Sequence, residues 1–113
     1  MSQITTHILD TSAGTPAAGV AVTLSRMTAQ GHWTEVAVGS TNNDGRIPGL
    51  LSDENSLEPG TYRLHFATGD YFKQRNTACF HPFVEVVFEL KDARHHHVPL
   101  LLNPFGYSTY RGS

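Results

Sequence analysis

Seven histidines stand among the 113 residues, and three of them are consecutive at His95, His96 and His97. In a strand, His95 and His97 point to the same face, and two such side chains can bind zinc when a third ligand completes the site. Neither a cysteine pair nor a His-Glu motif accompanies them. We therefore favour a polar strand start with solvated histidines, above all for His95, and expect no metal and no cofactor.

His97 differs from its neighbours because it borders the apolar run from Val98 to Leu102. A histidine at the edge of a buried region has a pKa that small environmental changes can move across neutral pH. His7 lies in another alternating segment, where a strand histidine satisfied by a neighbouring strand is the simpler interpretation. Arg46 follows a turn and is most simply a solvated arginine, although its planar guanidinium could also bind a carbonyl or an anion.

The C-terminal segment, Tyr107 to Ser113, is notable because chain ends are commonly frayed. Its residues alternate in type as they do in a strand, so we predict an ordered strand that runs to the last residue. Hydroxyl groups, the Arg111 guanidinium and the terminal carboxylate would then stand close to the histidines. Side chains of these kinds are typical of residues that line a binding site.

Length and charge set further bounds. We expect 113 residues to form one domain, residues 1–113, with one core. The net charge is −2 and the pI is near 6.3, so nucleic acid is not an expected partner. No apolar run approaches the ~18 residues of a membrane span, and the first residues lack the pattern of a signal peptide. We predict a cytoplasmic protein, or a periplasmic one if a leader was removed. The single cysteine, Cys79, is interpreted as a partly buried small residue.

Most of the sequence alternates between apolar and polar residues, and turn residues interrupt it at short intervals. This pattern is typical of sheets with one face on a core. We predict an all-β protein, an antiparallel β-sandwich of about eight strands with one short helix over residues 69–75, where Asp70 is the expected N-cap. Pro48 and Gly49 predict a short edge strand after Arg46. The clearest strands are expected over residues 4–10, 20–24, 33–38, 61–66, 84–90, 95–102 and 107–113.

These motifs, in this order, resemble the transthyretin-like proteins over nearly the whole chain. The N-terminal part contributes Ile4 to Thr11, Gly14-Thr15-Pro16-Ala17 and Gly19-Val20. The ending Tyr110-Arg111-Gly112-Ser113 is similar to the mark of the family's enzymatic branch, the 5-hydroxyisourate hydrolases, and vertebrate transthyretin, a hormone carrier, lacks it. Further matching segments are Asp44-Gly45-Arg46, Gly60-Thr61-Tyr62, Gly69-Asp70-Tyr71-Phe72, Phe80-His81-Pro82 and His97-Val98-Pro99-Leu100-Leu101-Leu102.

The resemblance implies a reaction in which water opens 5-hydroxyisourate, the unstable product of urate oxidation. The product is 2-oxo-4-hydroxy-4-carboxy-5-ureidoimidazoline, on the route from urate to allantoin. The resemblance also implies a transthyretin-type sandwich that forms a homotetramer, a dimer of dimers, with sites in the channel where dimers meet. It implies His7, Arg46, His97 and Ser113 as catalytic residues, and His7, Arg46, Tyr110, Arg111 and Gly112 as substrate-binding residues.

Two other classes of function stay open. A non-enzymatic transthyretin-like carrier of a small ligand would use the same channel, but a hydrophobic channel would not need two bases and an arginine. A structural accessory β-sandwich, or one that binds a metal through His95 and His97, is the other alternative.

Overall fold

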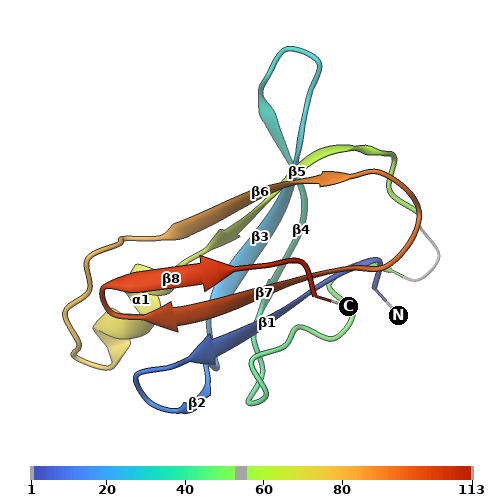
Figure 1. Cartoon of the computed structure of the whole chain (residues 1–113). Helices are drawn as coiled ribbons and strands as arrows, with labels where there is room; N and C mark the ends of the chain where they lie inside the picture. Colours follow the sequence, from blue (N-terminus) through green and yellow to red (C-terminus); the bar gives the residue numbers. More distant parts are fainter. Residues whose placement is uncertain (1, 53–55, 113) are drawn as a thin grey trace.

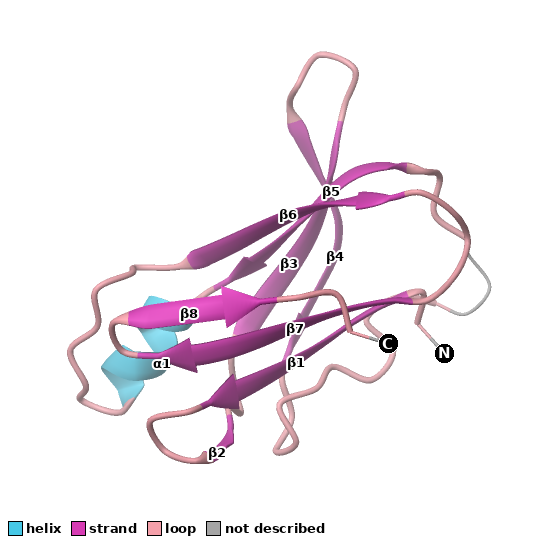
Figure 2. Ribbon diagram, in the orientation of Figure 1, coloured by secondary structure: helices cyan, strands magenta, loops and turns pink. Residues whose placement is uncertain are grey.

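The computed structural model describes residues 2–52 and 56–112, which form eight strands and one helix (Figures 1 and 2). The helix, α1, follows the fifth strand. In chain order the elements are β1 (Ile4–Asp10), β2 (Thr15–Pro16), β3 (Ala21–Met27), β4 (Trp33–Ser40), β5 (Gly60–Phe66), α1 (Thr68–Gln74), β6 (Val84–Leu90), β7 (His96–Asn103) and β8 (Gly106–Thr109).

The strands form two four-stranded sheets with the orders β2-β1-β7-β8 and β4-β3-β5-β6. The predicted alternation is confirmed, because buried and partly exposed residues alternate along the whole of β1 and along most of β5. The buried face of each sheet supplies the core between them. The largest fully buried side chains of this core are Tyr62, Phe66, Ile4, Ile8, Leu24, Leu64, Leu90 and Leu100.

The prediction of a β-sandwich is confirmed, but the expectation that it is antiparallel throughout is wrong for one strand pair. β1 and β7 are parallel, in register from Ile4 opposite His96 to Asp10 opposite Leu102. Parallel neighbours need a long connection, and here the whole second sheet lies between them in the chain. The first and the seventh strand therefore lie side by side in the centre of their sheet (Figure 1).

Three local expectations also need correction. The N-cap of α1 is Ala67, without a side-chain capping bond, and Asp70 lies in the first turn of the helix. No strand forms around Pro48, because Arg46 makes only an isolated bridge. The last strand, β8, ends at Thr109 and does not run to the end of the described chain.

Helix α1 is fixed to the first sheet through Asp10, the last residue of β1. One carboxylate oxygen accepts hydrogen bonds from the Ser12 hydroxyl and the Ser12 and Ala13 amides, and the other accepts one from the Tyr71 hydroxyl at 2.8 Å. Burial acts to raise the pKa of Asp10, but these hydrogen bonds outweigh it and hold the pKa below 3.8. Burial and the bond to Asp10 raise the pKa of Tyr71 to about 12.

The described part of the chain contains no helix that is long and apolar enough to cross a membrane.

Candidate functional site

The parallel ladder between β1 and β7 brings the two predicted site histidines to one face of the first sheet. Thr5 lies directly opposite His97, and His7 lies opposite Pro99, two positions further along. Because side chains alternate across a strand, Thr5, His7 and His97 share the face that points away from the core. All three are partly buried, so they are held in place yet reachable from outside.

Arg46 reaches this face through a tight turn at its N-terminal side. The Asn42 side chain accepts hydrogen bonds from the amides of Asp44 and Arg46 at 2.9 and 3.1 Å. Gly45 has a φ of +72°, and a Cβ there would stand 2.4 Å from the Ile8 carbonyl oxygen, so the position requires glycine. The Ile8 amide donates to the Gly45 carbonyl at 2.9 Å.

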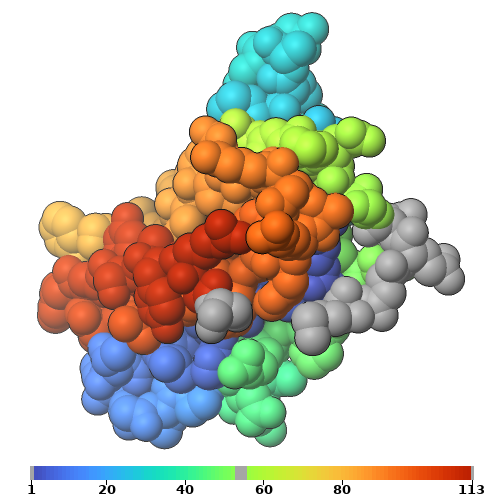
Figure 3. Space-filling view, turned by 45° about the vertical axis from the view of Figure 1, so that its right-hand side comes forward, coloured from blue at the N-terminus to red at the C-terminus, as the bar shows by residue number. Residues whose placement is uncertain are grey.

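The result is an isolated antiparallel bridge between His7 and Arg46 on the outer edge of β1. This edge has room for Arg46 because β2 pairs only with Leu9 and Asp10. Because β2 is so short, the edge of β1 beside His7 is left free, and Arg46 occupies it. In the space-filling view the blue N-terminal strand, the green loop after β4 and the red C-terminal segment lie on one face of the molecule (Figure 3).

The C-terminal segment packs against His97, the second of the two predicted site histidines. Its Gly112 amide donates to the His97 carbonyl at 2.8 Å, and the two residues form an isolated antiparallel bridge. A Cβ at Gly112 would lie only 2.5 Å from Cδ2 of the His97 ring. The tail therefore packs against the imidazole by its bare backbone, and glycine is the residue that permits this approach.

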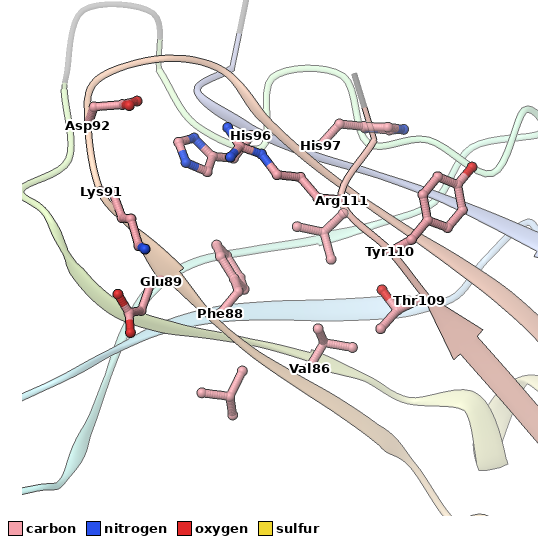
Figure 4. Close-up of a pocket in the computed structure, with 12 residues that line it drawn as sticks. Val86, Phe88, Glu89, Lys91, Asp92, His96, His97, Thr109, Tyr110 and Arg111 are labelled. Carbon is pink, nitrogen blue, oxygen red and sulfur yellow. The ribbon is translucent and has the colours of Figure 1, made fainter.

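His97 lies between two hollows. One is an open hollow of about 450 Å³ that also includes Thr5, Arg46 and His95 in its lining, with Thr6, Ile47 and Pro48. The other, of about 380 Å³, lies between β6 and the end of β8, and Tyr110 and Arg111 line it (Figure 4). The two side chains leave the tail in different directions (Figure 4).

The structure thus brings together His7, Arg46 and His97, and it places Gly112 against His97. Tyr110 and Arg111 share with these residues only the neighbourhood of His97, because they line the second hollow together with it. The Tyr110 side chain is 59% exposed. The predicted site residue Ser113 lies outside the described residues.

The electrostatic surroundings of His97 favour its neutral form. Burial lowers the pKa of His97 below its ordinary value of 6.5, and the positive charges of Arg46, His95 and His7 lower it further, in that order, while a backbone hydrogen bond to Thr5 acts in the opposite direction. A neutral imidazole at neutral pH can accept a proton, so His97 has the protonation state of a general base.

Thr5 and His95 are site residues that the sequence alone did not identify in these roles. The Thr5 hydroxyl lies 2.6 Å from Nε2 of His95 and 2.8 Å from Nδ1 of His97. The two rings face each other with centroids 6.1 Å apart. The available signal was the period-two spacing, which places Thr5 on the face of His7 and His95 on the face of His97.

Within the described residues no group of three His, Cys, Asp or Glu side chains has the arrangement of a metal site. His96, the third of the consecutive histidines, is buried and donates from Nδ1 to the Arg94 carbonyl at 2.7 Å.

Comparisons with known proteins identify the family and the fold. The family model described as "HIUase/Transthyretin family" matches residues 4–112. The 5-hydroxyisourate hydrolase of Mus musculus is 50% identical over 99% of this chain and 96% of its own length. The solved structure of Klebsiella pneumoniae 5-hydroxyisourate hydrolase has a TM-score of 0.85 and 40% identity, covering 97% of this chain and 98% of that one.

A transthyretin has an even higher structural similarity to this chain. Sea bream transthyretin in complex with thyroxine has a TM-score of 0.92 and 37% identity, covering 98% of this chain and 95% of that one. The family match over nearly the whole chain, together with these relatives, shows that the chain belongs to the HIUase/Transthyretin family.

Proposed function

We propose that this protein hydrolyses 5-hydroxyisourate to 2-oxo-4-hydroxy-4-carboxy-5-ureidoimidazoline in urate degradation. The observation that carries the proposal is the convergence of His7, Arg46 and His97 on one open sheet face. Relatives that carry the name of this hydrolase at up to 50% identity support it. Two bases and a guanidinium are the groups that hydrolysis of a polar ring requires.

The geometry suggests a separate catalytic role for each of the three residues. His97, kept neutral by burial, takes a proton from the attacking water. Arg46 donates hydrogen bonds to the oxygen that becomes negative at the attacked carbonyl carbon. His7, bridged to Arg46, orients the water or protonates the departing ring nitrogen. The C–O bond forms from water and the C–N bond breaks, so the reaction needs no serine or cysteine nucleophile.

Transport of a small ligand is the second candidate, and the similarity to transthyretin in complex with thyroxine favours it. The residues of the site argue against it. A carrier gains nothing from a partly buried imidazole whose pKa is lowered, or from a tail held against that ring by Gly112.

We further propose a homotetramer, a dimer of dimers, in which a second subunit covers the site. The hollow around Arg46 and His97 is open on one side, and β6 and β8 are free edges of the two sheets in the described chain. Unpaired edges and shallow sites on a small protein are commonly completed by assembly. Light scattering at working concentration tests this, and an active monomer would rule it out. Cytoplasmic location stays a prediction from the sequence.

The decisive experiment generates 5-hydroxyisourate from urate in the cuvette and follows its ultraviolet absorbance. The protein should accelerate the decay, while His7→Asn and His97→Asn should lose ~10²-fold or more, the contribution typical of acid–base catalysis. His32→Asn is the matched control, because His32 is exposed in the loop between β3 and β4. Circular dichroism confirms folding. Unchanged decay with the unmodified protein, combined with binding of thyroxine, would favour the carrier.

A further inference from the structure

The hydroxyl of Thr5 sits between two imidazoles. Its Oγ1 is 2.6 Å from Nε2 of His95 and 2.8 Å from Nδ1 of His97. The first distance is short for a hydrogen bond that involves nitrogen, and the second lies within the ordinary range. His95 is exposed and His97 is partly buried, so the chain of three groups leads from the site to the solvent.

A hydroxyl has one proton, and this limits the protonation of the two rings. Thr5 can donate to one ring nitrogen only, and it accepts from the other, which must then carry a hydrogen. If Thr5 donates to His95, Nδ1 of His97 is protonated and its Nε2 has a free lone pair. If Thr5 donates to His97, the arrangement reverses and Nε2 of His97 carries the hydrogen. One hydroxyl therefore couples the tautomers of both histidines.

The surroundings select the first arrangement. The side-chain hydrogen bond of the His97 ring to Thr5 is made through Nδ1, on the side of β1. The positive groups that face His97 are His7 on β1, Arg46 on the loop after β4 and His95 ahead of β7, and Arg111 lies on the side of the tail. They disfavour a doubly protonated ring but permit a single hydrogen on Nδ1.

We propose that Thr5 and His95 form a proton relay that keeps Nε2 of His97 unprotonated and carries away the proton that His97 receives. This inference rests on the proposed hydrolase function. Thr5 is a positioning residue, because it acts on the substrate only through His97. His95, which the sequence suggested was merely solvated, becomes the outer end of the relay.

The protons balance along the relay. Water gives a proton to Nε2 of His97 as its oxygen bonds to the carbonyl carbon. His97 passes its Nδ1 proton to Thr5, and Thr5 passes its hydroxyl proton to Nε2 of His95. His95 then releases one proton to solvent from Nδ1, and His7 gives one proton to the departing ring nitrogen and regains one from solvent. The relay resets when Nε2 of His97 loses its proton to solvent and one proton shifts back from His95 through Thr5 to Nδ1 of His97, while Nδ1 of His95 regains its proton from solvent. The sum is the consumption of one water.

The same geometry argues against a metal held between Nε2 of His95 and Nδ1 of His97. Both of these nitrogens lie at hydrogen-bond distance from the Thr5 hydroxyl, which stands between them.

The test combines spectroscopy with kinetics. Nitrogen-15 NMR of the unmodified protein at neutral pH should show His97 with hydrogen on Nδ1 and a bare Nε2. Thr5→Val removes the hydroxyl and His95→Phe keeps the ring but removes its nitrogens, and each should lower kcat about tenfold or more with little change in KM. Thr5→Ser should restore most of the rate. His32→Phe is the control and should keep the full rate.

Two results would overturn the relay. One is a bare Nδ1 in the NMR spectrum of the unmodified protein, which needs no variant to fold. The other is an unchanged kcat in both Thr5→Val and His95→Phe. The rate of the unmodified protein in the same assay tests the hydrolase function by itself. The relay is tested by the rates of the variants relative to that rate, so the two proposals can fail separately.

Discussion

Replacing Gly112 with alanine is expected to damage the site while leaving the sandwich folded. The new methyl carbon would lie 2.5 Å from Cδ2, 3.1 Å from Cγ and 3.3 Å from Cβ of His97. Ordinary contacts between carbon atoms are about 3.5–4.0 Å, so the ring and the tail must separate by roughly 1 Å. Overpacking of this kind costs about 1–3 kcal/mol when it cannot relax.

The tail can relax by lifting off, because among the residues that the structure describes a single bridge, to His97, holds Gly112 beyond the end of β8. We therefore expect a small change in Tm and a large change in rate. A misplacement of about 1 Å at a reacting group costs roughly 10²-fold. The decay of 5-hydroxyisourate absorbance measures this loss, which should appear in kcat more than in KM.

Gly106→Ala provides the matched control in the same strand region. A Cβ at Gly106 would lie 3.7 Å from the Asn103 side chain, an ordinary contact, and Gly106 does not have a positive φ. This variant should keep the full rate. If Gly112→Ala also keeps it while remaining assembled, the tail does not position His97, and the packing argument is refuted.

Three further outcomes follow from the structure. Arg46→Gln removes a positive charge beside His97, so the pKa of His97 rises and the acid limb of kcat/KM should move to higher pH. If the acid limb does not move, Arg46 does not lower the pKa of His97. Tyr71→Phe should lower the free energy of unfolding by about 1.5–3 kcal/mol in urea, as expected for a bond to a charged group. Because the pKa of Asp10 is lowered in the folded state, this bond contributes above pH ~4 and is lost in acid, so mutant and parent should converge there. Dialysis against a strong chelator should leave the rate intact, and a loss that zinc restores would revive the metal hypothesis for His95.

Much of the fold follows from local sequence, because the period of two fixes which face of each strand is buried. The alternation in residues 84–90 and 61–66 predicted β6 and β5 almost to the residue. The parallel pairing of β1 with β7 was not predictable in this way, since no local pattern records which distant strand is the neighbour. The end of β8 at Thr109 was also missed, because the alternation continues through the tail although the hydrogen bonding does not.

The site was predictable only in part. His7, Arg46 and His97 each had a simpler interpretation, and the resemblance to a family singled them out. Their convergence depends on the long-range ladder and on the turn at Gly45. Thr5 was missed because a threonine in a strand is ordinary, and its role depends on two distances that only the structure supplies.

The parallel pair has a consequence for how this protein is made. Thr5 and His97 are 92 positions apart in the chain. At about 5–20 residues per second, β1 waits roughly 5–18 seconds on the ribosome for the strand that completes it. The sheet β4-β3-β5-β6 draws only on residues 21–90 and can close earlier. A nascent chain halted before β7 can therefore contain all four strands of the second sheet but lacks His97 and the site.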